Sequence, residues 1–219
     1  MSESPTTDSH THDHDHDGPI RPEDVDWDER YRTEDQVWSG HVNGSLVDEV
    51  ADHAPGRALD VGCGEGADAI WLAERGWTVT AVDIAPTAIE RGRNEATRRE
   101  LTVDWIAADL LTDPPAGEFD LVSLQYPAFA IARRDEVTQT LNDALAPGGL
   151  LLLVGHAFPE DPDAIPFDPT DWVQPSDVIA ALPDGFEVEL DEVRPRPGAH
   201  HHHAGSPHVE DVVVRIVRR

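Results

Sequence analysis

The most informative part of the sequence is Leu59-Asp60-Val61-Gly62-Cys63-Gly64-Glu65-Gly66, which stands between an apolar segment and a helical pattern. The glycines let the backbone turn sharply and approach a ligand closely, and the helix that follows offers its first amide groups. This order is typical of the first strand, loop and helix of a nucleotide-binding sheet. The spacing is Gly-x-Gly-x-Gly, whereas a dinucleotide fingerprint requires Gly-x-Gly-x-x-Gly, so the loop alone is a weak signal.

Short apolar segments alternate with helical patterns after this loop. We predict strands at 58–61, 78–82, 103–107, 119–124 and 150–154, and helices at 67–75, 87–100 and around Val137, Leu141 and Leu145. This alternation favours a doubly wound parallel sheet with helices on both faces. A short helix at 177–182 precedes two more strands, 186–193 and 209–217, whose helix-free connection predicts an antiparallel pair at the sheet edge. The predicted fold class is α/β, with a mostly parallel sheet of seven strands.

Further signals lie next to the predicted strands. Asp83 ends the second strand, 23 residues after Asp60, where a doubly wound nucleotide site places a carboxylate for ribose hydroxyls. Asp109 follows the third strand, and Pro147-Gly148-Gly149 precedes the fifth. Together with the glycine loop, these residues make a strong signal for a cofactor site.

On these residues the sequence resembles class I S-adenosylmethionine-dependent methyltransferases, over roughly residues 57–219. The resemblance implies a Rossmann-like methyltransferase fold with a reversed last strand, and S-adenosyl-L-methionine as the cofactor. It implies these cofactor-binding residues: Asp60, Gly62, Cys63, Gly64, Gly66, Asp83, Ile84, Asp109, Leu110 and Gln125.

The same resemblance implies a role for each part of that set. Asp60 and the three glycines would line the methionine portion, and Asp83 would bind the ribose diol. Ile84 would pack against adenine, and Asp109, with Leu110 beside it, would reach the adenine amino group. Cys63 has no second cysteine to pair with, so its side chain is predicted to pack within the loop rather than to react.

An aromatic arm precedes the domain. Trp27-Asp28-Glu29-Arg30-Tyr31, followed by Trp38, resembles the small-molecule branch that includes thiopurine and tellurite-resistance methyltransferases. In that branch the arm folds over the cofactor, which implies that Trp27, Tyr31 and Trp38 face the substrate. An equally strong interpretation makes these rings core residues.

The predicted acceptor site lies after the fourth and fifth strands, at the carboxyl ends where such sheets bind ligands. Gln125 and Tyr126 follow the fourth strand, and Tyr126 is predicted to line the substrate pocket. His156 is the one histidine near a strand end, which makes it the predicted catalytic base or substrate contact. A soft acceptor such as a thiolate or a reduced metalloid oxyanion needs no base, whereas an oxygen or nitrogen acceptor often does.

The charge of the chain limits its partners. Among 219 residues there are 44 acidic and 16 basic ones, all of them arginine, which gives a formal net charge of −28. Such a chain repels phosphate backbones and anionic lipid, so we predict no nucleic-acid and no membrane partner. The turn after the fourth strand also lacks the Asp/Asn-Pro-Pro-Tyr sequence of adenine methyltransferases. Arg91, Arg93, Arg98 and Arg99 gather on one predicted helix, where we expect a solvated face.

Three segments follow from composition. Residues 1–22, rich in Asp and His, are predicted to be a disordered tail, 23–56 an arm and helix, and 57–219 the cofactor-binding domain. A single cysteine and the lack of a signal peptide or a long apolar run predict a cytoplasmic protein. The oligomeric state cannot be predicted.

Two histidine tracts are the unusual feature: His10, His12, His14 and His16, and His200, His201, His202 and His203. Imidazoles beside carboxylates can bind zinc, nickel or copper, but neither tract has the spacing of a structural zinc site. We therefore predict no metal site, with these tracts as the weaker alternative.

The leading functional hypothesis is a methyltransferase that acts on a small molecule such as a thiol, a metalloid or a small metabolite. A methyltransferase for protein or RNA is the second hypothesis. A histidine-rich metal-binding protein on a cofactor-binding scaffold is the third.

Overall fold

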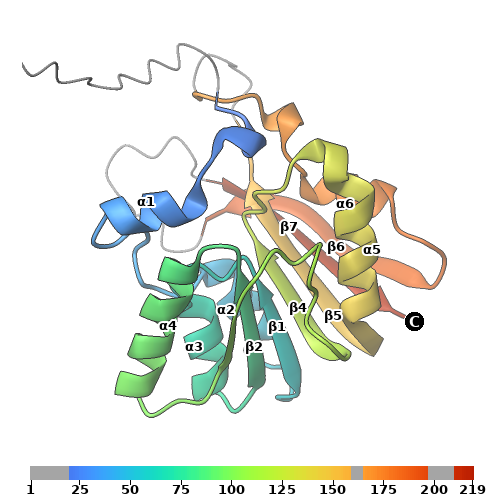
Figure 1. Cartoon of the computed structure of the whole chain (residues 1–219). Helices are drawn as coiled ribbons and strands as arrows, with labels where there is room; N and C mark the ends of the chain where they lie inside the picture. The colour runs from blue at the N-terminus through green and yellow to red at the C-terminus, as the bar shows by residue number, and fades with distance from the viewer. Residues whose placement is uncertain (1–19, 159–164, 197–209) are drawn as a thin grey trace, which may run out of the picture.

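A computed structural model of the chain describes residues 20–158, 165–196 and 210–219. These residues form a seven-stranded sheet in the order β3-β2-β1-β4-β5-β7-β6 (Figure 1). The strands are β1 (Arg57–Val61), β2 (Thr78–Asp83), β3 (Asp104–Ala107), β4 (Phe119–Gln125), β5 (Leu145–His156), β6 (Phe186–Pro195) and β7 (Glu210–Arg218). The first five strands run parallel, and β7 is antiparallel to both β5 and β6. The predicted fold class, including the reversed last strand, is confirmed.

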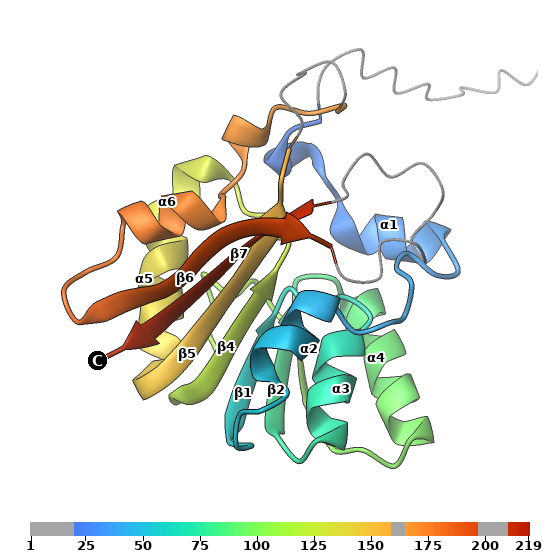
Figure 2. The same ribbon diagram turned by 180° about the vertical axis from the view of Figure 1, so that it is seen from behind.

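Helices cover both faces of this sheet (Figures 1 and 2). They are α1 (Trp27–Thr33), α2 (Gly44–Val50), α3 (Ala67–Glu74), α4 (Pro86–Arg98), α5 (Arg134–Ala144) and α6 (Pro175–Ala180), with short 3-10 helices at Pro22–Asp24, Ile131–Arg133 and Pro169–Asp171. Buried residues of α2, α3 and α4 form one hydrophobic cluster with the sheet, and those of α5 and α6 form another.

The strand β5 shows why its sequence is continuously apolar. Leu150, Leu152 and Val154 pack in the cluster under α2, α3 and α4. Leu151 and Leu153 pack in the cluster under α5 and α6. Since successive side chains of a strand point to opposite faces, a central parallel strand needs apolar residues at every position.

Most predicted bounds shift by a few residues, and Leu145 changes from a predicted helix to a strand. The helix predicted to include Leu145 ends at Ala144, and Leu145 begins β5 opposite Phe119. Pro147 disfavours helical geometry at the residue before it and supplies no amide donor, so the helix stops early. Leu145 is still fully buried in the same cluster as Val137 and Leu141, which explains its helix-like spacing.

The aromatic arm lies against the domain, as predicted, because α1 packs on α4. Thr87, at the start of α4, donates its backbone N–H to Asp28 at 2.8 Å. The predicted tail of residues 1–22 falls almost wholly outside the described residues, although Pro22 already belongs to a short helix. No helix in the described ranges is long and apolar enough to cross a lipid bilayer.

Candidate functional site

The predicted cofactor residues meet at one edge of the sheet, where the parallel strands have their carboxyl ends. Val61 at the end of β1 pairs with Val82 on β2 and with Leu124 on β4. The glycine loop that follows β1 therefore lies between Asp83 and Gln125. This is the switch point of the strand order, where ligands bind in doubly wound sheets.

The glycine loop needs its glycines for different physical reasons. Gly62, Gly64 and Gly66 all have positive φ, at 63°, 52° and 81°. A Cβ on Gly62 would meet no atom within 4 Å, so open space lies above that residue. A Cβ on Gly64 would lie 2.7 Å from the hydroxyl of Tyr31, and a Cβ on Gly66 would clash with the indole of Trp105. Only Gly62 therefore faces space that a ligand can fill.

Asp60, the fourth residue of β1, is a buried carboxylate without full hydrogen bonding. It is 2% exposed, and its Oδ2 has no hydrogen-bond partner among the described residues. Burial, followed by the negative charge of Asp68, raises the pKa of Asp60 well above its ordinary range. An unpartnered acid oxygen at this depth requires a donor or a cation, because leaving it unmet costs stability.

Asp83 orders the glycine loop. Its Oδ2 accepts the backbone N–H of Gly64 at 2.8 Å, and its Oδ1 accepts that of Ala85 at 2.9 Å. Burial raises the pKa of Asp83, and the two amides act in the opposite direction. Beside it, Ile84 exposes 56% of its surface, a large apolar surface at the edge of the site.

Asp109 is also held in place. Its Oδ1 accepts the backbone N–H of Leu111 at 2.9 Å, and Arg133 donates to its Oδ2 at 3.1 Å. Leu110, next to it, is only 4% exposed and packs in the core. Any contact of Leu110 with a ligand would therefore come from its backbone.

The arm rests on the glycine loop through Tyr31 and Trp38. The Tyr31 hydroxyl accepts the indole N–H of Trp38 at 2.6 Å, and Tyr31 is 3% exposed. Trp27 packs against the small buried cluster that contains Tyr31. Trp38 is 48% exposed. Of the two interpretations of these rings, the structure gives the core role to Tyr31 and leaves Trp38 open to solvent.

Arg91 joins the arm to the loop, contrary to the predicted solvated face of its helix. Its guanidinium donates to the carbonyl oxygens of Tyr31 and Glu34, at 2.5 and 2.6 Å, and to Glu65 in the loop at 2.8 Å. A planar guanidinium has five N–H donors, so it can bond several acceptors that lie around it at once. The prediction is wrong for this residue, whereas Arg98 and Arg99 do pair on the solvent side.

The predicted acceptor residues form a second cluster. The rings of Tyr126 and His156 stack with their centroids 4.5 Å apart. The Tyr126 hydroxyl donates to Asp211 Oδ2 at 3.1 Å, and Arg196 Nε donates to Asp211 Oδ1 at 2.9 Å. Gln125 donates to Ser123 at 3.0 Å, and its own Oε1 has no partner among the described residues.

Arg196 and Asp211 belong to this cluster, yet sequence reasoning missed both. Asp211 is fully buried near the start of β7, and Arg196 directly follows β6. The signal that the sequence offers is weak: Asp211 directly precedes the apolar run Val212–Val214. A row of aromatic rings continues from His156 through Phe158 and Phe167 to Trp172, with centroids 5.7 to 6.0 Å apart.

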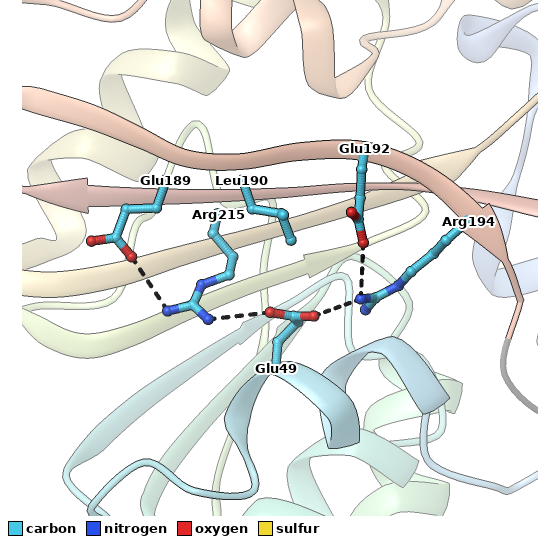
Figure 3. A pocket seen from close by; sticks show the side chains of 6 residues that line it. All are labelled: Glu49, Glu189, Leu190, Glu192, Arg194 and Arg215. Atoms are coloured by element: carbon cyan, nitrogen blue, oxygen red, sulfur yellow. Dashed lines mark hydrogen bonds and ion pairs between the residues drawn. The ribbon is translucent and has the colours of Figure 1, made fainter.

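A pocket of about 290 Å³ lies elsewhere, between α2 and the β6–β7 pair (Figure 3). In it, Glu49 of α2 bridges Arg194 at 2.7 Å and Arg215 at 3.2 Å. Both arginines also pair with glutamates of β6, Glu192 and Glu189. These ion pairs tie α2 to the last two strands, so we assign the pocket a structural role.

Metal ligation finds no support in the described ranges. Within residues 20–158, 165–196 and 210–219, no group of three or more His, Cys, Asp or Glu side chains is placed to hold a metal ion. Both histidine tracts lie outside those ranges.

Comparison with known proteins identifies the domain. Residues 58–149 match the family model described as a methyltransferase domain. This part of the chain is therefore similar to methyltransferase domains. The predicted resemblance to S-adenosylmethionine-dependent methyltransferases is confirmed, and with it the cofactor that the resemblance implies.

Two relatives carry names that state different substrates, a small molecule and a ribosomal RNA. One is the 2-heptyl-1-hydroxyquinolin-4(1H)-one methyltransferase of Mycobacteroides abscessus, 37% identical over 115 residues, covering 49% of this chain and 51% of that protein. The other is the ribosomal RNA small subunit methyltransferase C of Alcanivorax borkumensis, 33% identical over 107 residues, covering 47% of this chain and 33% of that protein. The chain thus spans about half the length of the first relative and a third of the second.

Two solved structures share the fold. One comes from work on the conversion of a disulfide bond into a thioacetal group during echinomycin biosynthesis, with a TM-score of 0.70, 24% identity, and coverage of 87% of this chain and 89% of that chain. The other is TehB from Haemophilus influenzae, with a TM-score of 0.64, 17% identity, and coverage of 81% and 62%. At these identities the likeness concerns the fold.

Proposed function

We propose that this protein transfers the methyl group of S-adenosylmethionine to a small-molecule acceptor in the cytoplasm. The observation that supports the cofactor site best is the buried Asp60 oxygen without a partner, next to the open space above Gly62. Asp60, Asp68 and Asp83 are buried acids whose pKa values are raised by burial, and a positive charge beside them would favour their ionised forms. A sulfonium cofactor that also bears an ammonium group matches these acids, because each of its two groups carries positive charge.

The residues around the loop fit the other parts of the cofactor. Asp83 keeps lone pairs for ribose hydroxyls after accepting its two backbone amides. Ile84 offers an exposed apolar surface for adenine, and Asp109 Oδ2 an acceptor for the adenine amino group. Tyr31 and Trp38 of the arm cover the loop from the other side.

When bound, the cofactor supplies a methyl group that is already activated by the positive sulfur. The protein is then left to align a nucleophile behind that methyl group and to exclude water. Tyr126, which follows β4, stacks with His156 at the end of β5, and in this proposal the pair shapes the acceptor site.

A small acceptor is favoured over RNA by charge. The net charge of −28 opposes binding of a phosphate backbone. Because one relative is named a ribosomal RNA methyltransferase, RNA is the alternative acceptor that the test includes.

The test is transfer of a radiolabelled methyl group from S-adenosylmethionine to a panel of thiols, phenols and metalloid oxyanions, with bulk RNA and bulk protein in parallel. We expect label in the small-molecule fraction alone. Label in RNA or protein would overturn the proposed acceptor class. Full activity of a Gly64→Ala variant would overturn the proposed cofactor site.

A further inference from the structure

Helix α2 reaches the acceptor side of the site as well as the ion pairs drawn in Figure 3. The acceptor cluster comprises Tyr126, His156, Arg196 and Asp211. Ser45 and Glu49 of α2 are four residues apart, so their side chains lie on one side of the helix. Ser45 Oγ lies 3.5 Å from Oδ2 of the fully buried Asp211. The same side of α2 therefore faces the acceptor cluster and, one turn later, the arginines of the last two strands.

The register of these two strands places Arg194 beside the acceptor cluster. Arg194 on β6 lies directly opposite Asp211 on β7, so the two side chains share one face of the sheet. Arg196 follows two residues later, and its Nε donates to the same Asp211 at 2.9 Å. The place of Arg196 in the acceptor cluster therefore depends on how the end of β6 is held.

Glu49 holds that end of β6. Its carboxylate lies between two guanidinium groups, 2.7 Å from Arg194 and 3.2 Å from Arg215 (Figure 3). The Glu49 side chain is only 9% exposed, so solvent screens these pairs little. Within the described part of the chain, Nε and Nη2 of Arg194 have no partner, and its Nη1 contacts Glu49 and the more exposed Glu192. Glu49 is thus the buried anion on which the position of Arg194 depends.

We propose that Glu49 is a positioning residue of the acceptor site, which acts through Arg194 and the end of β6 on Arg196. The inference rests on the proposed function, because it concerns the half of the site that would hold the methyl acceptor. Without the Glu49 charge, the two guanidinium groups lose the anion between them, and each turns toward its other glutamate on β6. The end of β6 then moves away from α2, and Arg196 leaves its place beside Tyr126 and Asp211.

The start of α2 is held by a separate connection. Asn43 donates its backbone N–H and its side-chain amide to Asp68 of α3, at 2.8 and 2.7 Å. These two bonds do not involve Glu49, which lies near the other end of the helix. Loss of the Glu49 charge should therefore disturb the contact with β6 and leave the cofactor side in place.

The first test reads Arg196 directly. ¹H–¹⁵N spectra of the full chain, labelled at arginine, resolve the Nε–H that donates to Asp211, and the signal is assigned by its absence in Arg196→Lys. In Glu49→Gln we expect this signal to shift and its exchange with water to become about tenfold faster. An unchanged shift and exchange rate would overturn the proposal.

The matched control is Asp48→Asn, which removes one negative charge from the exposed side of the same helix. It should leave the Arg196 signal unchanged, and an equal change in both variants would reduce the effect to net charge and overturn the proposal. If Glu49→Gln does not fold, Arg194→Gln breaks the same link from the strand side. The proposal then requires the same change in the Arg196 signal, and an unchanged signal would overturn it.

The second test separates acceptor from cofactor. Calorimetry of Glu49→Gln with S-adenosylhomocysteine should give an affinity within about twofold of the wild-type value. For each thiol, phenol or metalloid oxyanion that the wild-type chain methylates, KM should rise about fivefold in the variant while kcat changes less. An unchanged KM, or a loss of cofactor affinity as large as the change in KM, would overturn the positioning role.

The wild-type chain distinguishes failure of this proposal from failure of the proposed function. If it does not bind S-adenosylhomocysteine or methylates no member of the panel, the proposed function fails, and the acceptor role of Glu49 fails with it. If it binds and methylates but the Arg196 signal and KM ignore Glu49→Gln, only the positioning role is overturned.

Discussion

The two halves of the site are built in different ways. On the cofactor side, residues 60–66 are consecutive, and Asp83 at the end of the next strand closes the loop by accepting the N–H of Gly64. On the acceptor side, Tyr126, His156, Arg196 and Asp211 come from four separate segments and meet only in the folded sheet. A cofactor common to a family needs a fixed local loop, whereas an acceptor site is assembled from variable connections.

The largest expected effect is on the cofactor side. Gly64→Ala places a methyl group 2.7 Å from the Tyr31 hydroxyl at a residue with φ of 52°. Backbone strain and displacement of the arm should lower cofactor affinity by about 2–4 kcal/mol, measured by equilibrium dialysis with labelled S-adenosylmethionine.

The matched control is Gly148→Ala, which has a φ of 77° but open space around its Cβ. It imposes the same kind of backbone strain far from the loop, so cofactor affinity should stay at the wild-type value. Equal losses in both variants would show that general instability, and not the contact of arm and loop, is responsible.

The second effect concerns Asp83. Asp83→Asn replaces one acceptor oxygen by a donor, beside two backbone amides that need acceptors and the ribose hydroxyls that we expect there. Cofactor affinity should fall by about 1–3 kcal/mol in calorimetry. Asp109→Asn should lower cofactor affinity less than Asp83→Asn does, because Arg133 already occupies the Asp109 carboxylate. A larger loss in Asp109→Asn would show that Asp109, and not Asp83, is the more important cofactor contact.

A third prediction tests whether the two halves are independent. Tyr126→Phe removes the hydroxyl that donates to the buried Asp211, so the free energy of unfolding should fall by about 1–2 kcal/mol in urea titrations. The affinity for S-adenosylhomocysteine should not change. A large loss of that affinity would show that the acceptor cluster also supports the cofactor site, so the two halves would not be independent.

The smallest effect is a pH dependence. The folded-state pKa of Asp60 is raised, so between its ordinary pKa and this raised value the folded protein binds more protons than the unfolded chain. Its contribution to stability is full at acidic pH and is lost as pH rises through the raised pKa. Each such group contributes at most about 1.4 kcal/mol per pH unit. Asp60→Asn should flatten the slope of unfolding free energy against pH, and an unchanged slope would contradict the raised pKa of Asp60.

These contrasts also mark what the sequence could predict. The glycine loop, Asp60 and Asp83 were predictable, because a strand, a tight turn and a helix start impose local rules on consecutive residues. Leu145 was placed on a helix because apolar spacing does not separate a helix end from a strand start. Arg91 was predicted to lie on a solvated face, because its partners are backbone carbonyl oxygens of Tyr31 and Glu34, 60 and 57 residues earlier in the chain. Backbone acceptors leave no mark in the sequence around Arg91.

The acceptor cluster shows the limit most clearly. Position alone put Tyr126 and His156 at strand ends, where the structure also has them. His156 lies within hydrogen-bond distance of Arg196, which is 40 residues further on and carries no motif. Long-range contacts of this kind arrange the acceptor side, and a single sequence does not contain them.

The most direct measurement for the central claim is calorimetry of the purified full chain with S-adenosylmethionine, S-adenosylhomocysteine and NAD. The account predicts micromolar binding of the first two, no binding of NAD, and loss of binding in Gly64→Ala. Binding of NAD alone, or no binding of any of the three, would contradict a methyltransferase cofactor site at residues 60–66.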